Sequence, residues 1–505
     1  MAGGTGPSVA AAETASQTLH RLTSYDAGWY RAHRSMPDAD WPAPAADARL
    51  MVNFKTDDLS RFPWFYKRFG ELLPRLPLPR NLPVTAAPAV DVLAGGGEVG
   101  LRKLDLPGLS RLLYLSAGVV RTRERPGGTW LFRAAGSAGA RFPLELYVAA
   151  PEGSGVAAGV HWYDPQEHAL VRIGPAPRAG APAIVMTGIP WRTGWRYRER
   201  GYRHIYWDAG TVLAHMLAAA DSAGIAARLY TGFPDAQVAA LVGADRVHEL
   251  PVAVVALGDE APAIKPAGPA VAGEVDAAPM EFPLVTATQR AGEQDVLGDS
   301  WDSGVPVVTP ARSADPVEEV VLRRGSQRRM DPRRALSGDQ LRTCLLAALR
   351  GIDLRHYVAV HHVEEFAPGL YRWPDMSAPA RPGDLRSEMY WVCLEQSLGR
   401  DAAFVVISAA DVATLNDREY RAAQLAAGLV EGRLHLLAYS LGASASGMTF
   451  LDGEIPALIG EPIDALLFTC IGVPAYKAAR GGPPGSPTAV GHLRPAAEEP
   501  RAGAR

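Results

Sequence analysis

The second half of this chain repeats the first. Residues 200–243 and 418–460 carry the same pattern of aromatic, basic and small residues at a spacing of 218 positions, which shifts by one residue at the end. The matched pairs are Tyr202 with Tyr420, Arg203 with Arg421, Gly210 with Gly428, and Gly224 with Gly442. One period of this length is far longer than the roughly 20–50 residues of a solenoid unit. The repeat therefore predicts two copies of one α/β domain, arranged much as a homodimer would be.

Both halves contain segments that fit buried helices and strands. Residues 106–119 carry apolar side chains at helical spacing, and a long helix is predicted from near Tyr202 to Gly224. In the second half, Ser337 is placed to cap a further helix. Continuous apolar runs, which are typical of buried strands, occupy residues 144–150, 159–165, 181–188 and 252–258. The pattern predicts an α+β fold that occurs twice.

Composition divides the chain into six segments. A stretch rich in Ala, Pro, Gly and Asp separates the two repeats and predicts a linker. The small, polar N-terminus predicts disorder. We expect a disordered N-terminus (1–16), an irregular lead-in (17–103), a first domain (104–258), a linker (259–318), a second domain (319–480) and a disordered tail (481–505).

Charge and cysteine content exclude several classes of function. A net charge of −3 provides no general basic field for nucleic acid. The three cysteines lie far apart, which argues against a disulfide framework or a zinc module. His361 and His362 would point to opposite faces of a strand, so we expect no metal site. With no apolar run near the ~18 residues that span a membrane and no signal-peptide pattern, we expect a cytoplasmic protein without a membrane partner.

The sharpest local motif is RRGSQRR, residues 323–329. Arg324, Ser326 and Arg328 alternate along it, and guanidinium groups around a serine can direct several donors at one phosphate. Further along, the segment YKAAR supplies Lys477 and Arg480, two cations that could reach the same phosphate. The alternatives are a solvated basic turn for the first motif and the start of a charged tail for the second.

Two further motifs lie in the first half. Residues 133–148 read RAAGSAGARFPLELYV, where small residues from Gly136 to Gly139 let the backbone approach a flat ring and Ser137 can donate a hydrogen bond. An ordinary glycine-rich turn is the alternative. Residues 191–210 combine five arginines, several aromatic rings and His204, a density suited to binding or stacking on a substrate. An exposed basic face is the alternative there.

These motifs together resemble the nitroreductase-like FMN superfamily, and more closely its SagB-type (azoline) dehydrogenases in a tandem-domain form. The resemblance covers most of 104–258 and 320–478. It is carried by FRAAGSAGARFPLELYV, GVHWYDPQEHALVRI, WRYRERGYRHIYWDAG and SGMTFLD, and RRGSQRR is similar to the family's phosphate-binding motif. The resemblance implies an α+β nitroreductase-like fold in which two copies form a pseudo-dimer with FMN at their interface.

The resemblance also assigns roles to individual residues. It implies that Arg324, Ser326 and Arg328 hold the FMN phosphate, with added charge from Lys477 and Arg480. It places Ser137 and Gly139 against the isoalloxazine from the other copy, and Gly447 and Met448 near the ring. The catalytic candidates are Tyr197 and Arg196. Many SagB-type enzymes carry a Lys-Tyr pair at the matching place, and here the pair is Arg196-Tyr197.

Comparing the two halves gives a hypothesis about stoichiometry. The first half lacks a run like RRGSQRR, and the second half passes from its first helix directly into DLRHYVAV without the small-residue loop. Each half thus keeps what the other has lost. We expect one composite FMN site per chain and a degenerate mirror site.

The resemblance implies oxidation of peptide thiazolines or oxazolines to azoles in ribosomal peptide biosynthesis. The bound FMN would supply the redox chemistry, while the protein orients the substrate and handles the proton. Tyr197 could act as acid, base or hydrogen-bond anchor, whereas Arg196 is a poor base because its pKa exceeds ~12. We expect a peptide substrate, a separate cyclodehydratase partner and, beyond the internal pseudo-dimer, a possible further homo-oligomer.

Two other functions stay open. One is NAD(P)H-dependent reduction of a nitro compound, quinone or alkene in the same fold, which the replacement of Lys by Arg196 favours. The other is a non-catalytic scaffold in a modification complex, which the loss of half of each site makes conceivable.

Overall fold

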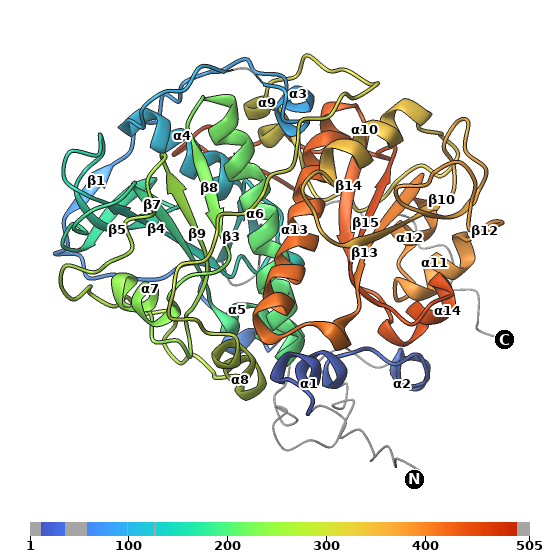
Figure 1. The fold of residues 1–505 in the computed structure, drawn as a ribbon, viewed down its shortest axis with the longest axis horizontal. Helices are drawn as coiled ribbons and strands as arrows, with labels where there is room; N and C mark the ends of the chain where they lie inside the picture. The colour runs from blue at the N-terminus through green and yellow to red at the C-terminus, as the bar shows by residue number, and fades with distance from the viewer. Residues whose placement is uncertain (1–11, 36–57, 98, 126–127, 492–505) are drawn as a thin grey trace, which may run out of the picture.

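Two α+β halves flank a central pair of long helices in the computed structural model, which describes residues 12–35, 58–97, 99–125 and 128–491. The central helices are α6 (Gly201–Ser222) and α13 (Asp417–Ser440), and they lie side by side (Figure 1). Trp207 contacts Gln424 and Thr211 contacts Gly428, so the contacts advance together along both helices and the helices run in the same direction.

The first half is built on a seven-stranded antiparallel sheet in the order β1-β6-β5-β4-β7-β9-β8. Its strands are β1 (Arg75–Pro77), β4 (Leu144–Ala150), β5 (Gly159–Asp164), β6 (Ala169–Gly174), β7 (Ala183–Gly188), β8 (Ala227–Tyr230) and β9 (Leu250–Leu257). Its helices besides α6 are α4 (Leu106–Ala117), α5 (Pro190–Tyr197), α7 (Asp235–Val242) and α8 (Pro283–Ala291). Every residue of β4, β7 and β9 is buried, as their continuous apolar runs predict.

The second half is built on a six-stranded antiparallel sheet in the order β12-β11-β10-β13-β15-β14. Its strands are β10 (Arg355–Val360), β11 (Gly369–Arg372), β12 (Arg381–Pro382), β13 (Phe404–Ala410), β14 (Ser444–Met448) and β15 (Asp464–Gly472). Its helices besides α13 are α9 (Val317–Arg323), α10 (Gly338–Ala348), α11 (Arg386–Val392), α12 (Ser397–Asp401) and α14 (Ile455–Ile459). Ser337 caps α10 as predicted.

The two sheets have the same topology. Six strands of the first half, β6-β5-β4-β7-β9-β8, match the six of the second half in order, and the central helix follows the fourth strand of each set in the chain. This arrangement confirms the repeat read from the sequence and the prediction of an α+β fold with two tandem copies.

Matched glycines bring the two halves together. A Cβ on Gly210 would lie 2.2 Å from the carbonyl oxygen of Leu425, and a Cβ on Gly428 would lie 2.2 Å from that of Trp207. No side chain fits at either position, so the backbones of α6 and α13 approach each other directly. These two glycines, 218 positions apart in the sequence, therefore lie where the two halves of the pseudo-dimer meet.

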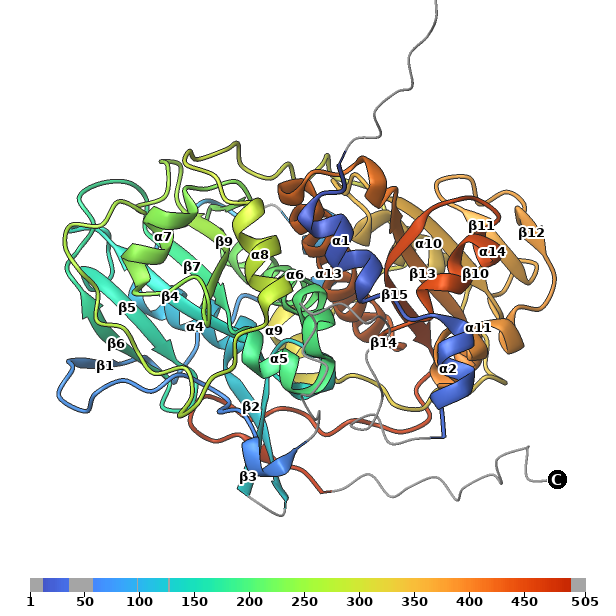
Figure 2. The same cartoon turned by 90° about the horizontal axis from the view of Figure 1, so that it is seen from below.

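A third, small sheet joins the C-terminal segment to a β-hairpin of the first half. It consists of β2 (Val119–Arg125), β3 (Gly128–Arg133) and β16 (Thr488–Ala489), which pairs with β2 in parallel. Figure 2 shows this hairpin projecting from the body with the C-terminal segment beside it. Our expectation of a disordered tail from residue 481 is therefore wrong up to residue 491, because this segment forms backbone pairs with the first half.

The N-terminal segment is also more regular than expected. It forms α1 (Ala15–Leu22), α2 (Ala27–His33) and, further on, α3 (Ala89–Leu93). The predicted disorder of residues 1–16 is wrong at its end, because Ser16 belongs to α1 and its hydroxyl donates to Asp417 at 2.5 Å. Residues 1–11 lie outside the described part of the chain. None of the helices in the described residues is both long and apolar enough to cross a membrane.

Candidate functional site

A cavity of 1290 Å³ opens between the two halves. Ligand pockets typically measure roughly 300–1,000 Å³, so this cavity can hold a cofactor together with a second molecule. Its walls come from α1 and α2, the β2–β3 hairpin, residues 135–142, the end of α5 with residues 198–200, residues 324–328 and residues 476–479.

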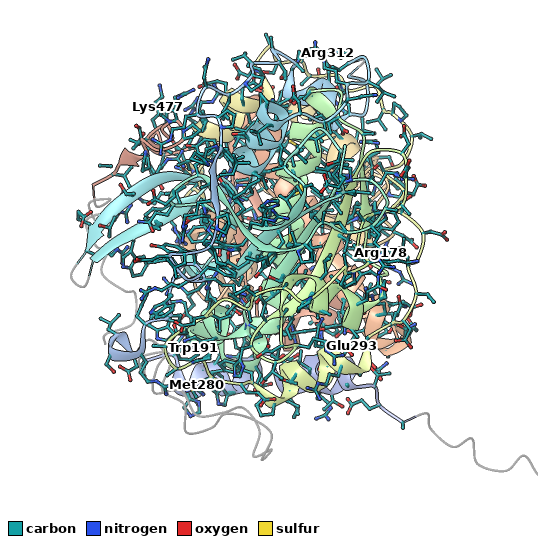
Figure 3. All side chains as sticks on the ribbon, turned by 90° about the vertical axis from the view of Figure 1, so that its left-hand side faces the viewer. Arg178, Trp191, Met280, Glu293, Arg312 and Lys477 are labelled. Carbon is teal, nitrogen blue, oxygen red and sulfur yellow. The ribbon has the colours of Figure 1, made fainter. Side chains whose placement is uncertain are left out.

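Backbone pairing builds one wall from two distant segments of the second half. Ala475 donates its N–H to the carbonyl of Arg329 at 3.1 Å, and Asp331 donates to the carbonyl of Val473 at 2.9 Å. Gln327 fixes the turn from inside by donating its side chain to the carbonyl of Arg329 at 2.8 Å. The predicted residues Arg324, Ser326, Arg328 and Lys477 all line the cavity on this wall. Figure 3 shows Lys477 at the edge of the molecule, close to the hairpin.

Arg324 connects this wall to the first half. Its Nε donates to the carbonyl of Ala134 at 2.8 Å, and only 3% of the residue is exposed. Burial, together with the neighbouring Arg121, lowers the pKa of Arg324 to about 10. One of its terminal nitrogens, Nη1, is buried and has no hydrogen-bond partner among the described residues. A buried guanidinium nitrogen without an acceptor indicates an anion-binding position.

Arg121 of β2 holds the same segment from the other side. Its Nε donates to the carbonyl of Ala479 at 2.7 Å, and one terminal nitrogen donates to the carbonyls of Leu322 and Arg324 at 2.7 and 2.8 Å. A side chain of the first half thereby positions the basic segment of the second half.

The small-residue loop of the first half lies directly against the basic segment. A Cβ on Gly136 would lie 3.5 Å from Nη1 of Arg324 and 3.6 Å from Oγ of Ser326. The sequence motifs of the two halves, about 190 residues apart in the chain, therefore meet at one place. This contact is the central observation on the site.

The loop is held in a strained conformation. Gly139 has φ 57°, and the non-glycine residues Ala140 and Phe142 also have positive φ values of 53° and 46°. Ser137 fixes the loop because its hydroxyl donates to Asp208 at 2.5 Å and accepts the N–H of Phe142 at 2.8 Å. Positive φ values at non-glycine residues cost energy and are concentrated at functional sites.

The predicted catalytic pair lies beside this loop. A Cβ on Gly139 would lie 2.7 Å from the hydroxyl of Tyr197 and 2.9 Å from Cδ of Arg196. The Tyr197 ring stacks on the ring of His204, with centroids 3.9 Å apart and planes at 13°. Burial raises the pKa of Tyr197 to about 12, so its hydroxyl is protonated at neutral pH. The next residue, Arg198, ends α5 with φ 51°.

Two buried carboxyl groups near the loop were not singled out from the sequence. Asp208 accepts from Ser137 and from the N–H of Ala138 at 3.0 Å, and burial raises its pKa to about 8. Glu199 accepts the N–H of Val285 at 3.1 Å near the start of α8, and burial raises its pKa to about 8. Both belong to the segment 191–210, whose many arginine and aromatic residues indicate a basic, aromatic surface and give no sign that its two carboxyl groups are buried.

Three of the predicted cofactor residues do not line the cavity. Gly447 packs against Glu431, whose Oε1 would lie 2.2 Å from a Cβ at this position, and Met448 is buried in the core of the second half. Arg480 pairs with Glu319 at 2.8 Å instead of facing the cavity. Strand β14 ends at Met448, and it is the following residue, Thr449, that reaches the cavity wall.

The cavity is strongly cationic. The described residues that line it include twelve arginine or lysine side chains and a single carboxylate, that of Glu199. The overall charge of the chain is −3, so this concentration of positive charge is local. The site is suited to anionic ligands.

The position related to this site by the repeat is filled by protein. In the second half, Tyr439 lies near Arg324. The residue of the first half that corresponds to Tyr439 in the repeat is Asp221, and it lies near Arg350 and Arg433. Arg350 donates to the carbonyls of Ser303 and Gly304 at 2.6 and 2.8 Å, and its guanidinium carbon lies 2.9 Å from where a Cβ on Gly95 would be. An arginine and a linker loop thus fill the position.

No group of three or more His, Cys, Asp or Glu side chains that could hold a metal ion occurs in the described part of the chain. The three cysteines are buried and unpaired.

Comparison with known proteins identifies the fold. Residues 135–259 match the model of the nitroreductase family. The protein MJ1384 of Methanocaldococcus jannaschii, named a putative nitroreductase, is 29% identical over 170 residues, which cover 31% of this chain and 81% of that protein. The match to the nitroreductase family model lies in the first half of the chain.

The similarity in structure extends over both halves. The crystal structure of a protein from Anabaena variabilis, also named a putative nitroreductase, matches with a TM-score of 0.70 at 22% identity. The match covers 92% of this chain and 100% of that chain. A chain of the E. coli microcin synthetase McbBCD complex, solved with truncated pro-MccB17 bound, matches 31% of this chain and 65% of its own length at 24% identity and a TM-score of 0.27, a level that carries no conclusion about activity. The predicted nitroreductase fold is confirmed.

Proposed function

We propose that this chain is an FMN-dependent oxidoreductase with one composite cofactor site. Arg324, Ser326 and Arg328 of the second half would hold the phosphate, with Lys477 beside them. The contact of Gly136 with Arg324 and Ser326 inside the cavity supports this assignment, because it brings the two motifs of the resemblance together.

The residues that line the cavity fit both the phosphate and the flat ring of FMN. The buried Nη1 of Arg324 has no acceptor among the described residues, and a phosphate oxygen would supply one. At the loop, Gly136 and Gly139 both line the cavity, and the absence of side chains lets Arg324 and Ser326 pack on Gly136 and lets Tyr197 pack on Gly139. Bound FMN would supply the electron-transfer chemistry, and the chain would supply binding, orientation and proton handling.

The stoichiometry follows from the mirror position. Arg350 and the linker carbonyls of Ser303 and Gly304 occupy the space that a second cofactor would need. The second half also lacks the small-residue loop. We therefore propose one FMN per chain.

The proposed reaction is dehydrogenation of a peptide thiazoline or oxazoline to the azole. Tyr197 stands at the cavity beside the loop and would donate a hydrogen bond to the substrate, whose ring loses two electrons and two protons in this reaction. Its raised pKa keeps the hydroxyl protonated, so almost no tyrosinate is present at neutral pH to act as a base, and Arg196 would stabilise negative charge rather than remove a proton. A peptide substrate and a separate cyclodehydratase partner belong to this proposal.

The same two residues favour a second candidate, an NAD(P)H-dependent reductase of nitro, quinone or alkene substrates. A protonated Tyr197 next to Arg196 suits a reaction in which the protein gives a proton to the product. Such a reaction does not need the base that the azoline reaction requires.

Two assays on the FMN-loaded protein separate these candidates. The first follows azole formation in an azoline-containing peptide under air by mass spectrometry, as a loss of two mass units per ring. The second follows NADPH oxidation with a nitroaromatic acceptor. Azole formation without NADPH oxidation supports the dehydrogenase. The reverse result supports the reductase, and a protein that takes up no FMN would contradict both and favour the scaffold.

A further inference from the structure

Two arginines on β2 face the cavity apart from the proposed phosphate wall. Arg123 and Arg125 are two positions apart on one strand, so their side chains project from the same face, and both line the cavity. Glu124, between them, points to the other face and accepts a hydrogen bond from Thr129 at 2.7 Å.

Aromatic rings of β3 hold the two guanidinium groups in place. The guanidinium of Arg125 lies 4.1 Å from the centroid of the Trp130 ring, and that of Arg123 lies 5.4 Å from the centroid of Phe132. Both rings also line the cavity. A guanidinium stacked on a ring keeps its N–H donors available in its own plane, where they can bind a carboxylate or phosphate in bidentate fashion.

In the described part of the chain, the Nε atoms of these two arginines have no acceptor. The Nε atoms of Arg123 and Arg125 are buried without a hydrogen-bond partner among the described residues, and no carboxylate in that part of the chain forms an ion pair with either. Burial, and next the charge of Arg125, lower the pKa of Arg123. Two adjacent positive charges without a counterion repel each other, and an anion between them removes that cost.

Arg125 lies further along the strand from the cofactor wall than Arg123, whose charge also interacts with Tyr476 of that wall. Arg121, the third arginine on this face of β2, is occupied by the carbonyls of Ala479, Leu322 and Arg324. At about 3.4 Å per residue, Arg125 lies roughly 13 Å further along the strand toward the hairpin tip. The cavity is large enough for a second ligand at that distance.

We propose that Arg123 and Arg125 form a second anion-binding subsite that recognises a carboxylate or phosphate group of the substrate. The inference rests on the proposed function only in taking this second molecule to be the substrate. The subsite itself is a property of the hairpin and can be measured with or without cofactor.

The test uses three aromatic probes that share one ring and differ in charge: 4-nitrobenzoate, 4-nitrophenyl phosphate and neutral 4-nitrobenzamide. Binding is measured by isothermal titration calorimetry to the full chain, as purified and after saturation with FMN. We expect an anionic probe to bind about tenfold more tightly than the amide. The tighter of the two anions shows whether the subsite prefers carboxylate or phosphate.

Variants assign the preference to the hairpin. In Arg125→Gln, and more fully in the double variant with Arg123→Gln, the preference for the anion disappears while FMN content stays that of the parent. Arg178→Gln is the charge-matched control, because this exposed arginine does not line the cavity and lies on the opposite side of the view in Figure 3 from Lys477.

Two results would overturn the inference. One is equal affinity for the anionic and neutral probes in the parent protein. The other is loss of FMN from Arg125→Gln with unchanged probe binding, which would assign these arginines to the cofactor phosphate. A protein that binds no FMN but shows the anion preference and its loss in Arg125→Gln would contradict the proposed function and support the subsite.

Discussion

Arg324 and Arg328 belong to one short motif but meet different surroundings. Arg324 is buried, bonded to the carbonyl of Ala134, and left with one nitrogen for an anion, whereas Arg328 is exposed at the cavity wall. Arg324 therefore links the two halves in addition to its proposed role, and its loss would disturb the fold. Arg328 is the better residue for testing phosphate binding alone.

We expect Arg328→Gln to weaken FMN binding about tenfold, because one charge-assisted hydrogen bond contributes roughly 1.5–3 kcal/mol. The matched control is Arg480→Gln. The sequence placed Arg480 at the same phosphate, but its guanidinium pairs with Glu319 outside the cavity. Fluorescence titration with FMN measures both variants, and equal losses would show that the assignment of the wall is wrong.

We expect the hydroxyl of Tyr197 to take part in the proposed reaction in its protonated form. Because burial raises the pKa of Tyr197 to about 12, the pH–rate profile should show no rise from tyrosine ionisation between about pH 7 and 10. Tyr197→Phe should lower kcat about 100-fold with FMN content unchanged. A rate that climbs through pH 10 in the parent but not in the variant would instead show that the tyrosinate acts as a base.

Asp208 should make the stability of the protein depend on pH. Burial raises the pKa of Asp208 to about 8 from an ordinary 3.8, so the folded protein keeps a proton that the unfolded chain has already lost. The contribution of this group is fully present below about pH 4 and is lost as pH rises toward 8.

Asp208→Asn removes this titration. Relative to the parent, the free energy of unfolding of the variant should rise by at most about 1.4 kcal/mol per pH unit between pH 4 and 8. Urea unfolding at a series of pH values measures the difference. For the exposed control Asp299→Asn, the free energy of unfolding should change with pH as it does in the parent. The same pH dependence in Asp208→Asn would contradict the expectation.

At the scale of elements, the packing of α6 on α13 supports the whole site. Gly428→Ala would place a Cβ 2.2 Å from the carbonyl oxygen of Trp207, so the helices must move apart. We expect a loss of about 1–3 kcal/mol in the free energy of unfolding, as for overpacked cores, together with weaker FMN binding. Gly100→Ala is the control, since a Cβ there meets nothing within 4 Å. Thermal unfolding followed by flavin fluorescence reports both effects, and an unchanged Gly428→Ala would argue against close helix contact.

Elements with strong periodic or apolar patterns could be predicted from the sequence. Helix α4 begins at the predicted residue 106, and the predicted strands correspond to β4, β5, β7 and β9. These segments carry their own burial pattern, so no distant information is needed. The pairing of β16 with β2 could not be predicted, because two residues in a tail have no pattern and their order depends on a strand more than 360 residues away.

The site could be predicted in part for the same reason. Arg324 and Ser137 lie in local motifs, and the structure brings both segments to one cavity. The resemblance places Met448 and Arg480 at the cofactor. In the structure, Met448 is buried at the end of β14 and Arg480 forms an ion pair with Glu319, and neither arrangement can be read from the local motif. The arginines of β2 were not singled out, because an alternating strand pattern does not show which face meets a cavity.

At the scale of the whole molecule, one chain does the work that a symmetric pair of subunits would share. Both halves keep the sheet order and the central helix, and the large cavity opens at one of the two equivalent interface positions. At the other, Arg350 donates hydrogen bonds to the carbonyls of Ser303 and Gly304 in the linker. On the proposed assignment, the second half serves as support and as the phosphate-binding wall of one composite site.

The most direct test of this account is the amount of FMN bound per chain. The purified protein is saturated with FMN, freed of excess by gel filtration and denatured, and the released flavin is quantified against protein concentration. The account predicts about one FMN per chain, falling toward zero in a double variant with Arg328→Gln and Lys477→Gln, which removes two cations of the wall and leaves Arg324 in place. Two FMN per chain would contradict the composite site, and a protein that binds none would contradict the proposed cofactor altogether.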